Sequence, residues 1–148
     1  MADADGPEPA PSFSLEEAQA ILAAQPFSAL LGARVTELAG GVATLEIDID
    51  ERHRQQYGVL HGGVLAYLAD NAITFAAGSV LGATVLTGGM TIDYLRTARA
   101  GVLRARAHVV HADSRHAVAT AEVTAEVPDG EVRRCAVAQG TVLVSSRG

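Results

Sequence analysis

The sequence has no lysine and only one cysteine, Cys135. A single cysteine excludes an internal disulfide and a cysteine-based metal cluster, and we expect no metal site. Arginine supplies all 11 basic residues against 17 acids, which gives a net charge of −6. This balance argues against a nucleic-acid-binding surface.

The arginines are unevenly spread along the chain. Seven of them lie in residues 96–134, whereas residues 1–51 contain ten acids and only Arg34. We interpret most of these arginines as solvent-facing positions on strands. The alternative is a local anion site for a phosphorylated ligand, because guanidinium groups bind phosphate with paired hydrogen bonds.

An uninterrupted apolar run long enough to span a membrane is also missing. The longest candidate, residues 62–80, contains Asp70, Asn71 and Thr74, which are costly in lipid. The first residues, MADADGPEPAPS, are acidic and rich in proline, unlike a signal peptide. We therefore expect a disordered acidic tail over residues 1–12, a single domain over residues 13–148, no membrane partner and a cytoplasmic location.

The residues that are present alternate between two periodicities. Ser14 and Glu17 form a capping-box pattern that opens a short helix, and Pro26 ends it. A further helical turn at residues 27–31 leads toward a strand. Strict alternation predicts a strand over residues 42–50, and a long helix follows over residues 62–78. The period-two pattern then returns in four segments, at residues 85–96, 101–113, 116–127 and 131–146. This order predicts an α+β fold with an antiparallel sheet packed on the long helix.

One acid, Asp70, interrupts the long helix. Its helical neighbours at offsets of three and four are Ala66, Tyr67, Ile73 and Thr74, so it shares a face with small and apolar groups. A structural acid bonded to backbone or to a second subunit is one interpretation, and a functional carboxylate is the other. Ionised groups are rarely buried without a partner or a role.

Two glycines, Gly62 and Gly63, stand where this helix begins, directly after His61. Glycine permits the close approach of another backbone or of a ligand. Free N–H groups and the positive end of the helix dipole favour anions and polarised carbonyl oxygens. Such a helix terminus and a carboxylate two turns later can serve as an oxyanion site and a base or nucleophile. A tight turn with good caps is the alternative.

These residues form the pattern G-x-x-HGG-x-x-x-x-L-A-D, from Gly58 to Asp70. The pattern resembles that of the hotdog-fold acyl-CoA thioesterases of the phenylacetate-pathway (PaaI-like) type. Supporting segments are FSALLGARV before the first strand, MTIDYLR after the helix and DSRHAVATAEV before the last strand. The resemblance covers residues 27–144.

The resemblance implies a long central helix wrapped by a curved antiparallel sheet, the hotdog fold. It implies a homodimer in which two sheets join into one, and often a homotetramer. Active sites then lie at the dimer interface and take residues from both chains. The implied substrate is an acyl-CoA thioester, so coenzyme A is part of the substrate and no separate cofactor is expected.

The resemblance also carries roles onto individual residues. Asp70 is implied to be the general base or the nucleophile, the N–H of Gly62 to hold the thioester oxygen, and His61 to shape the turn. Six positions before the histidine the family usually has an asparagine that places the attacking water; this chain has Gln55, with Gln56 as a competitor.

Two threonines are added to the catalytic set. Thr87 stands seven residues before the strand tyrosine Tyr94, where the family often has a serine or threonine that reaches the site. Thr74 lies one helical turn after Asp70, and its spacing alone predicts a bond to the carboxylate or the water.

Further residues are expected to bind substrate. The loop Ser114, Arg115 and His116 is a candidate for the coenzyme A phosphates, with a plain polar hairpin as the alternative. Apolar groups near the helix and the preceding loop should line the acyl pocket, and with the helix-start glycine the expected substrate-binding set is Gly63, Val59, Leu60, Tyr67 and Phe27.

The predicted activity is hydrolysis of an aryl-acyl or medium-chain acyl-CoA to free acid and coenzyme A. A hotdog hydratase is a weaker alternative, since Asp70-Asn71-Ala72-Ile73 lacks the proline and histidine of an Asp-x-Asn-Pro-x-His signature. A non-catalytic acyl-CoA-binding protein of the same fold is the other, and the Gln55 departure leaves room for it.

Overall fold

The computed structural model describes residues 10–146. Its elements in chain order are α1 (Leu15–Ala23), α2 (Pro26–Leu31), β1 (Arg34–Ala39), β2 (Val42–Ile49), the 3-10 turn η1 (Glu51–His53), α3 (Gly62–Leu81), β3 (Val85–Tyr94), β4 (Gly101–Ala112), β5 (His116–Glu126) and β6 (Val132–Val144).

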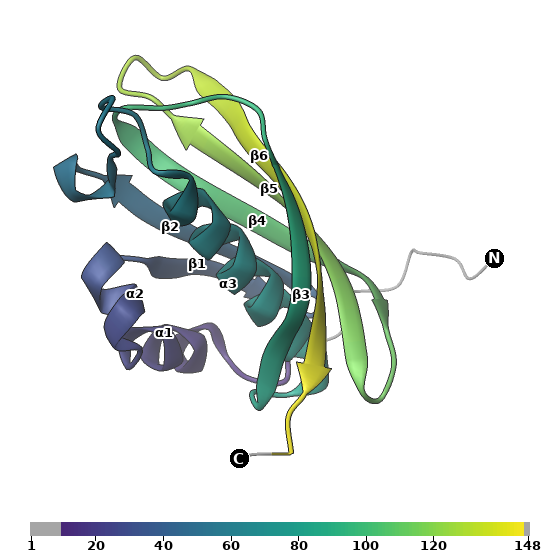
Figure 1. The fold of residues 1–148 in the computed structure, drawn as a ribbon. Coiled ribbons are helices and arrows are strands. Elements are labelled where there is room, and N and C mark those ends of the chain that lie inside the picture. Colours follow the sequence, from purple (N-terminus) through teal and green to yellow (C-terminus); the bar gives the residue numbers. More distant parts are fainter. Residues whose placement is uncertain (1–9, 147–148) are drawn as a thin grey trace.

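The six strands form one sheet in the order β1-β2-β4-β5-β6-β3, and every neighbouring pair is antiparallel. The sheet curves around α3, while α1 and α2 lie beside the β1 edge (Figure 1). Two strands precede the long helix and four follow it, so the predicted α+β layout is confirmed. Strand β3 closes one edge of the sheet and pairs only with β6 among the described residues.

The core forms between α3 and the inner face of the sheet. Strand alternation places Leu45 and Ile47 of β2 on that face, and both are fully buried. On β5 the inner positions are mostly alanines, and Ala117, Ala119 and Ala125 are also fully buried. These small side chains let α3 lie close to the sheet. Each large buried side chain contributes about 1.5–3 kcal/mol.

Helix α3 is long and apolar enough to cross a membrane by length and composition alone. However, 61% of its most apolar stretch is buried inside the domain, as expected of a core helix. The helix runs from Gly62 to Leu81, three residues beyond the predicted end.

The N-terminal segment behaves as its caps predict. Ser14 and Glu17 form the capping box of α1. Pro26 occupies the first turn of α2, where its missing N–H costs nothing. Gly32, with φ of 73°, ends α2 in the left-handed conformation and turns the chain into β1.

Most of the predicted disordered tail lies outside the described residues, which begin at residue 10. Within it, Ser12 is held by α3: its N–H donates to the Ser79 carbonyl and its hydroxyl to the Gly78 carbonyl, both at 2.7 Å. Ordered contacts with the domain therefore start at least one residue before the expected boundary at residue 13.

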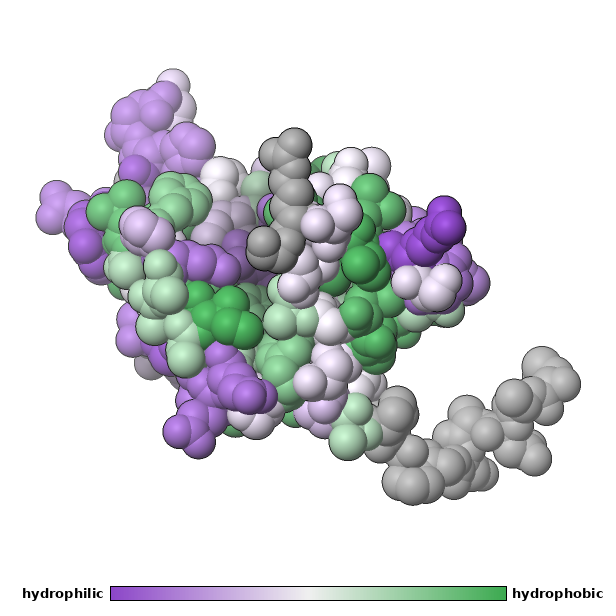
Figure 2. All heavy atoms as spheres, turned by 90° about the horizontal axis from the view of Figure 1, so that it is seen from below, coloured by the Kyte–Doolittle hydropathy of each residue, from purple (hydrophilic) through white to green (hydrophobic). Residues whose placement is uncertain are grey.

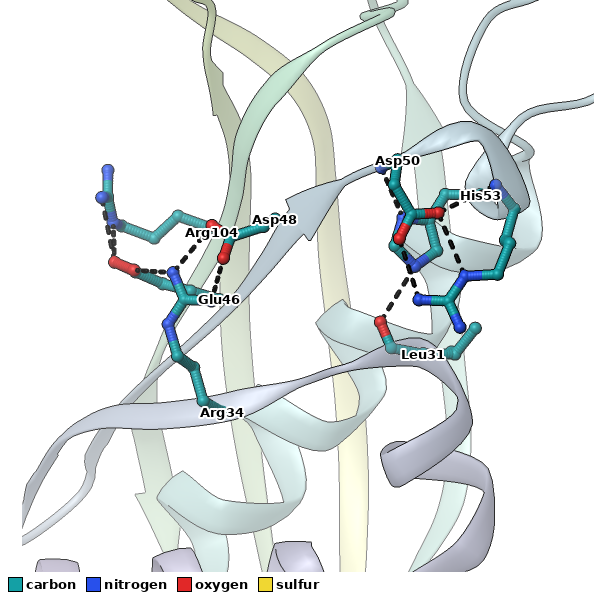
Figure 3. A network of polar contacts seen from close by, with 8 residues as sticks. Leu31, Arg34, Glu46, Asp48, Asp50, His53 and Arg104 are labelled. Carbon is teal, nitrogen blue, oxygen red and sulfur yellow. Dashed lines mark hydrogen bonds and ion pairs between the residues drawn. The ribbon is translucent and has the colours of Figure 1, made fainter.

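The outer face of the sheet carries the arginines, and these are paired with acids. Arg34 contacts Glu46 and Asp48, and Arg104 contacts the same Glu46 at 2.9 Å (Figure 3). Further along, Arg106 pairs with Glu37 at 3.0 Å. Solvent-facing strand positions were the preferred interpretation, and it holds for these residues. Exposed pairs of this kind contribute about 0–1 kcal/mol each.

Candidate active site

The carboxylate of Asp70 is held by two threonine hydroxyls. Thr87, on β3, donates to Asp70 Oδ1 at 2.6 Å, and the Thr74 hydroxyl lies 3.4 Å from the same oxygen. The two hydroxyls are 2.9 Å apart, and Thr74 also donates to the Asp70 carbonyl at 2.8 Å. Asp70 Oδ2 has no hydrogen-bond partner among residues 10–146. This oxygen is therefore available to accept a proton from water.

Asp70 opens onto a cleft of about 370 Å³ between α2, α3 and β3. Its apolar walls come from Phe27 and Tyr67, which pack edge to face with ring centroids 5.4 Å apart, and from Met90. The predicted substrate-binding residues Phe27, Tyr67 and Gly63 are thus brought to the same cleft as Asp70.

A hydrogen-bond chain anchors one wall of this cleft. The Tyr67 hydroxyl donates to Ser28 Oγ at 2.5 Å, and Ser28 donates to the Gln25 side-chain oxygen at 2.6 Å. Burial raises the pKa of Tyr67; the Ser28 bond opposes this shift and the charge of Asp70 adds to it. Tyr67 therefore remains a neutral donor at physiological pH. Sequence reasoning missed Ser28, Gln25 and Met90, because their places follow from how α2 and β3 pack on α3.

The start of α3 is built by His61. Its side chain caps the helix, since Nδ1 accepts from the Gly63 N–H at 2.8 Å. A Cβ on Gly63 would come within 2.9 Å of that nitrogen, so the cap requires glycine there. Because Nδ1 accepts, the proton of the neutral ring lies on Nε2. His61 thus caps the turn that starts α3, and its role in the active site stays a prediction.

Gly62 is the first residue of α3, so its N–H lies outside the helix's own hydrogen bonds. The ring of Tyr94, at the end of β3, lies directly beside it: a Cβ on Gly62 would be 3.4 Å from Tyr94 Cε1. Tyr94 itself is 54% exposed. The N–H and the tyrosine therefore form one wall of a second half-site, at the opposite end of β3 from Thr87.

The loop between β2 and α3 is more ordered than its polar composition suggested. His53 is only 1% exposed; its Nδ1 accepts from the Asp50 N–H at 3.0 Å and its Nε2 contacts the Leu31 carbonyl at 2.9 Å (Figure 3). The His53 carbonyl accepts from the His61 N–H at 2.8 Å. Hydrogen bonds from Arg52 hold the pKa of Asp50 at about 2, so the Asp50 carboxylate stays ionised in mild acid. His53 thus links the turn at His61, where α3 begins, to the end of α2.

Gln55 forms its hydrogen bonds within its own loop. Its side-chain oxygen accepts from the Tyr57 N–H, and its N–H donates to the Val59 carbonyl at 2.8 Å. Leu60 is buried and bonds through its N–H to Ala98. Val59, Leu60 and Gln55 thus lie at the Gly62 end of the molecule rather than in the Asp70 cleft, and their roles stay predictions.

The candidate phosphate loop, Ser114 to His116, joins β4 to β5 at the sheet end where β3 begins. Two of its N–H groups, those of Arg115 and His116, already donate to Asp113 Oδ1 at 2.8 and 3.0 Å. A phosphate would find the Arg115 side chain and the Ser114 hydroxyl there, next to a carboxylate. Coenzyme A binding at this loop stays a prediction.

Asp70 and Gly62 do not meet within one chain. They are eight residues apart on α3, which corresponds to about 12 Å along the helix axis. A single thioester carbonyl cannot touch both. Each chain therefore presents two separated halves of a site, a carboxylate half with Asp70, Thr74 and Thr87 and an amide half with Gly62 and Tyr94.

Comparison with known proteins identifies the family of this chain. A family model described as the thioesterase superfamily matches residues 57–131, about half of the chain. The matched range includes helix α3, which carries both Asp70 and Gly62. The chain belongs to the thioesterase superfamily. A solved thioesterase family protein from Silicibacter pomeroyi is 32% identical, has a TM-score of 0.78 and is matched over 87% of this chain and 93% of its own.

Two further proteins are similar to this chain at lower sequence identity. The 1,4-dihydroxy-2-naphthoyl-CoA hydrolase of Listeria monocytogenes is 28% identical over 83 residues, which are 55% of this chain and 68% of that protein. The PaaI protein of the E. coli phenylacetic acid degradation operon shares the fold, with a TM-score of 0.77 at 24% identity over 88% of this chain and 92% of its own. The hotdog fold and the resemblance to hotdog thioesterases are confirmed, and with them a thioester hydrolase.

Proposed function

We propose that this thioesterase hydrolyses acyl-CoA thioesters in the cytoplasm, with Asp70 as the general base or the nucleophile. The observation that carries the proposal is the Asp70 carboxylate, oriented by Thr87 and facing an apolar cleft through a free oxygen. A similar protein named as a naphthoyl-CoA hydrolase supports coenzyme A as the leaving group. The paired aromatic rings of Phe27 and Tyr67 favour an aryl-acyl group over a straight chain.

The chemistry follows from the two half-sites. The Gly62 N–H and the α3 dipole stabilise the negative charge that develops on the thioester oxygen. Asp70 either takes a proton from the attacking water or attacks the carbonyl itself and forms an anhydride that water then hydrolyses. In both routes the C–S bond breaks and coenzyme A leaves as a thiolate.

The two half-sites meet if β3 pairs with β3 of a second copy. Its outer edge is unpaired within the described residues, and an unpaired edge strand of ten residues is a ready pairing surface. Antiparallel pairing over the whole strand sets Val85 opposite the partner's Tyr94, because β3 runs from Val85 to Tyr94. The Thr87 end, which holds Asp70, then lies against the partner's Tyr94 and the amide beside it. A homodimer is the minimal catalytic unit, and a tetramer of such dimers is compatible with it.

Exposed apolar side chains support an interface at this edge. Leu86 of β3 is 63% exposed and lies opposite Leu143 of β6, which is 45% exposed. The view from below shows hydrophobic groups at the surface rather than beneath hydrophilic cover (Figure 2). Pairing of two β3 strands would cover part of this surface.

The test is turnover of Asp70→Asn, measured as thiol release from a panel of aryl-acyl and aliphatic acyl-CoA substrates. We expect kcat to fall by about 100-fold or more, because the amide neither accepts the proton nor attacks. Asp129→Asn is the matched control: Asp129 is an exposed acid in the turn between β5 and β6, away from the cleft and from β3, and its variant should retain turnover.

Near-normal turnover of Asp70→Asn would remove Asp70 from the mechanism. If the wild-type protein binds acyl-CoA tightly and the thioester is recovered intact from every substrate, the chain is a binding protein and the proposal fails. Loss of acyl-CoA without thiol release would indicate hydration instead.

A further inference from the structure

The tip of the β4–β5 hairpin gathers three metal-ligating side chains that the Asp70 cleft does not use. The ligand atoms of His111, Asp113 and His116 all lie within 4.8 Å of one another. His116 Nδ1 is 2.8 Å from Asp113 Oδ2, and His111 Nε2 is 4.0 Å from the same oxygen. Ligands at about 2.1 Å from a tetrahedral zinc ion are about 3.4 Å apart. The three atoms are therefore spaced for one ion after small side-chain rotations.

A β-bulge puts the two histidines on the same face. Val109 pairs with the inner-facing Ala119, but the register then shifts, and His111 pairs with Val118 instead of a residue on the inner face. Without the extra residue, His111 would follow Val109 onto the core side, because strand side chains alternate. Bulges commonly re-aim a side chain at a functional position.

Two backbone N–H groups of the hairpin loop orient the carboxylate of Asp113. Its Oδ1 accepts from the Arg115 and His116 N–H groups at 2.8 and 3.0 Å, which leaves Oδ2 toward the two imidazoles. These two backbone bonds fix the orientation of the carboxylate. Oriented, hydrogen-bonded carboxylates of this kind support metal sites.

The same contacts argue for a cation over an anion at this loop. The amides that a phosphate would need are occupied, and the group at the centre is a carboxylate. All three ligand side chains are solvent-accessible, with exposed fractions of 62%, 47% and 36% for His111, Asp113 and His116. An ion can therefore enter without rearrangement of the sheet.

We propose that His111 Nε2, Asp113 Oδ2 and His116 Nδ1 bind one divalent transition-metal ion, with water in the remaining position. Two imidazoles and one carboxylate suit zinc and its neighbours rather than magnesium or calcium, which prefer all-oxygen sites. The ion cross-links β4 to β5 and stabilises the hairpin. The sequence spacing His-x-Asp-x-x-His alone did not predict this, since it cannot show which side of the strand His111 faces.

The experiment is titration of the untagged, chelator-treated protein with zinc chloride by calorimetry, in a buffer that does not bind zinc. We expect saturable binding at one ion per chain and a rise in Tm with zinc but not with magnesium. In long-range nitrogen–proton spectra, the resonances of His111 Nε2 and His116 Nδ1 should shift while those of His61 and His108 stay fixed.

Two variants and one control make the assignment specific. His111→Ala should weaken zinc binding at least about 10-fold. Asp113→Asn should do so as well, while its amide oxygen still accepts the two loop N–H bonds, so the hairpin stays folded. His108→Ala removes another exposed histidine of β4, whose ring contacts Thr120 at 3.2 Å, and should bind zinc like the wild type.

Absence of saturable zinc binding to the wild type would overturn the proposal and leave the cluster as an ion pair only. Zinc affinity that is unchanged in both His111→Ala and Asp113→Asn would overturn it too, because the ion would then bind elsewhere. Neither result would affect the Asp70 chemistry, whose readout is thiol release.

Discussion

At Asp70, two hydroxyl groups converge on one carboxylate oxygen and leave the other free. The short bond from Thr87 crosses from β3 to α3 and fixes the rotamer of the acid. The Thr74 hydroxyl donates to the backbone carbonyl of Asp70, one helical turn earlier. In the proposed mechanism, Thr87 is therefore a positioning residue, and the free oxygen of Asp70 is the reacting atom.

Replacement of Thr87 tests this division of roles. Thr87→Val keeps the side-chain shape but removes the donor, so the carboxylate loses its orienting bond. We expect kcat to fall by about 10-fold, in line with about 1.5 kcal/mol for a hydrogen bond to a charged group, with little change in KM. Steady-state kinetics with one good acyl-CoA substrate give both constants.

Thr87→Ser serves as the matched control, since it retains the hydroxyl and should restore most of kcat. A Thr87→Val variant with unchanged kcat, or a serine variant as slow as the valine one, would show that the hydroxyl does not position Asp70.

At the scale of elements, the loop between β2 and α3 positions the Gly62 amide. Its anchor is His53, which links the Asp50 N–H to the end of α2 through Leu31 and supports His61 through its carbonyl. In this arrangement Nδ1 accepts from the Asp50 N–H and Nε2 donates to the Leu31 carbonyl.

His53→Ala should destabilise the fold by on the order of 3 kcal/mol. The change removes a buried ring, opens a cavity, and leaves the part-buried Asp50 N–H and Leu31 carbonyl without the His53 bonds. The free energy of unfolding from urea titrations gives this value. His108→Ala, on the exposed face of β4, is the control and should change stability by less than about 0.5 kcal/mol. Equal stability of the two variants would contradict the anchoring role of His53.

At the scale of the whole molecule, each chain holds two incomplete half-sites about 12 Å apart along α3. The proposed twofold dimer through β3 would complete two sites, each with Asp70 from one chain and the amide of Gly62 from the other. Two inactive variants can then complement each other, which a site within one chain could not do.

Gly62→Pro is the partner for Asp70→Asn in this test. Proline is tolerated in the first turn of a helix, and His61 already has the extended conformation required before proline, with φ of −65° and ψ of 132°. The variant thus removes the N–H and keeps the helix. Each variant alone should be nearly inactive.

Co-expression of the two variants should restore about a quarter of the wild-type activity per chain. Half of randomly formed dimers are mixed, and each mixed dimer contains one site with both groups intact. Thiol release by the co-expressed mixture measures this directly, and tandem-purified mixed dimers, with one intact site of two, should reach about half of the wild-type activity per chain. No activity in the mixed dimers would show that the two groups do not act on one thioester across the interface.

The sequence by itself determined the order of elements, the core-facing pattern and the main catalytic candidates. Alternation in residues 42–50 and the apolar helix around Asp70 are local properties, since period and caps depend on neighbouring residues. The HGG turn is local as well, because the His61 cap acts over two residues.

Only the tertiary structure decided which distant residues meet. The bond from Thr87 to Asp70 and the wall formed by Ser28 and Met90 depend on how α2 and β3 pack on α3. The buried state of His53 in a polar loop, and the bulge that turns His111 to the outer face, likewise follow from long-range packing and strand register. Local spacing carries no information on these contacts, because they join segments that become neighbours only when the sheet closes around the helix.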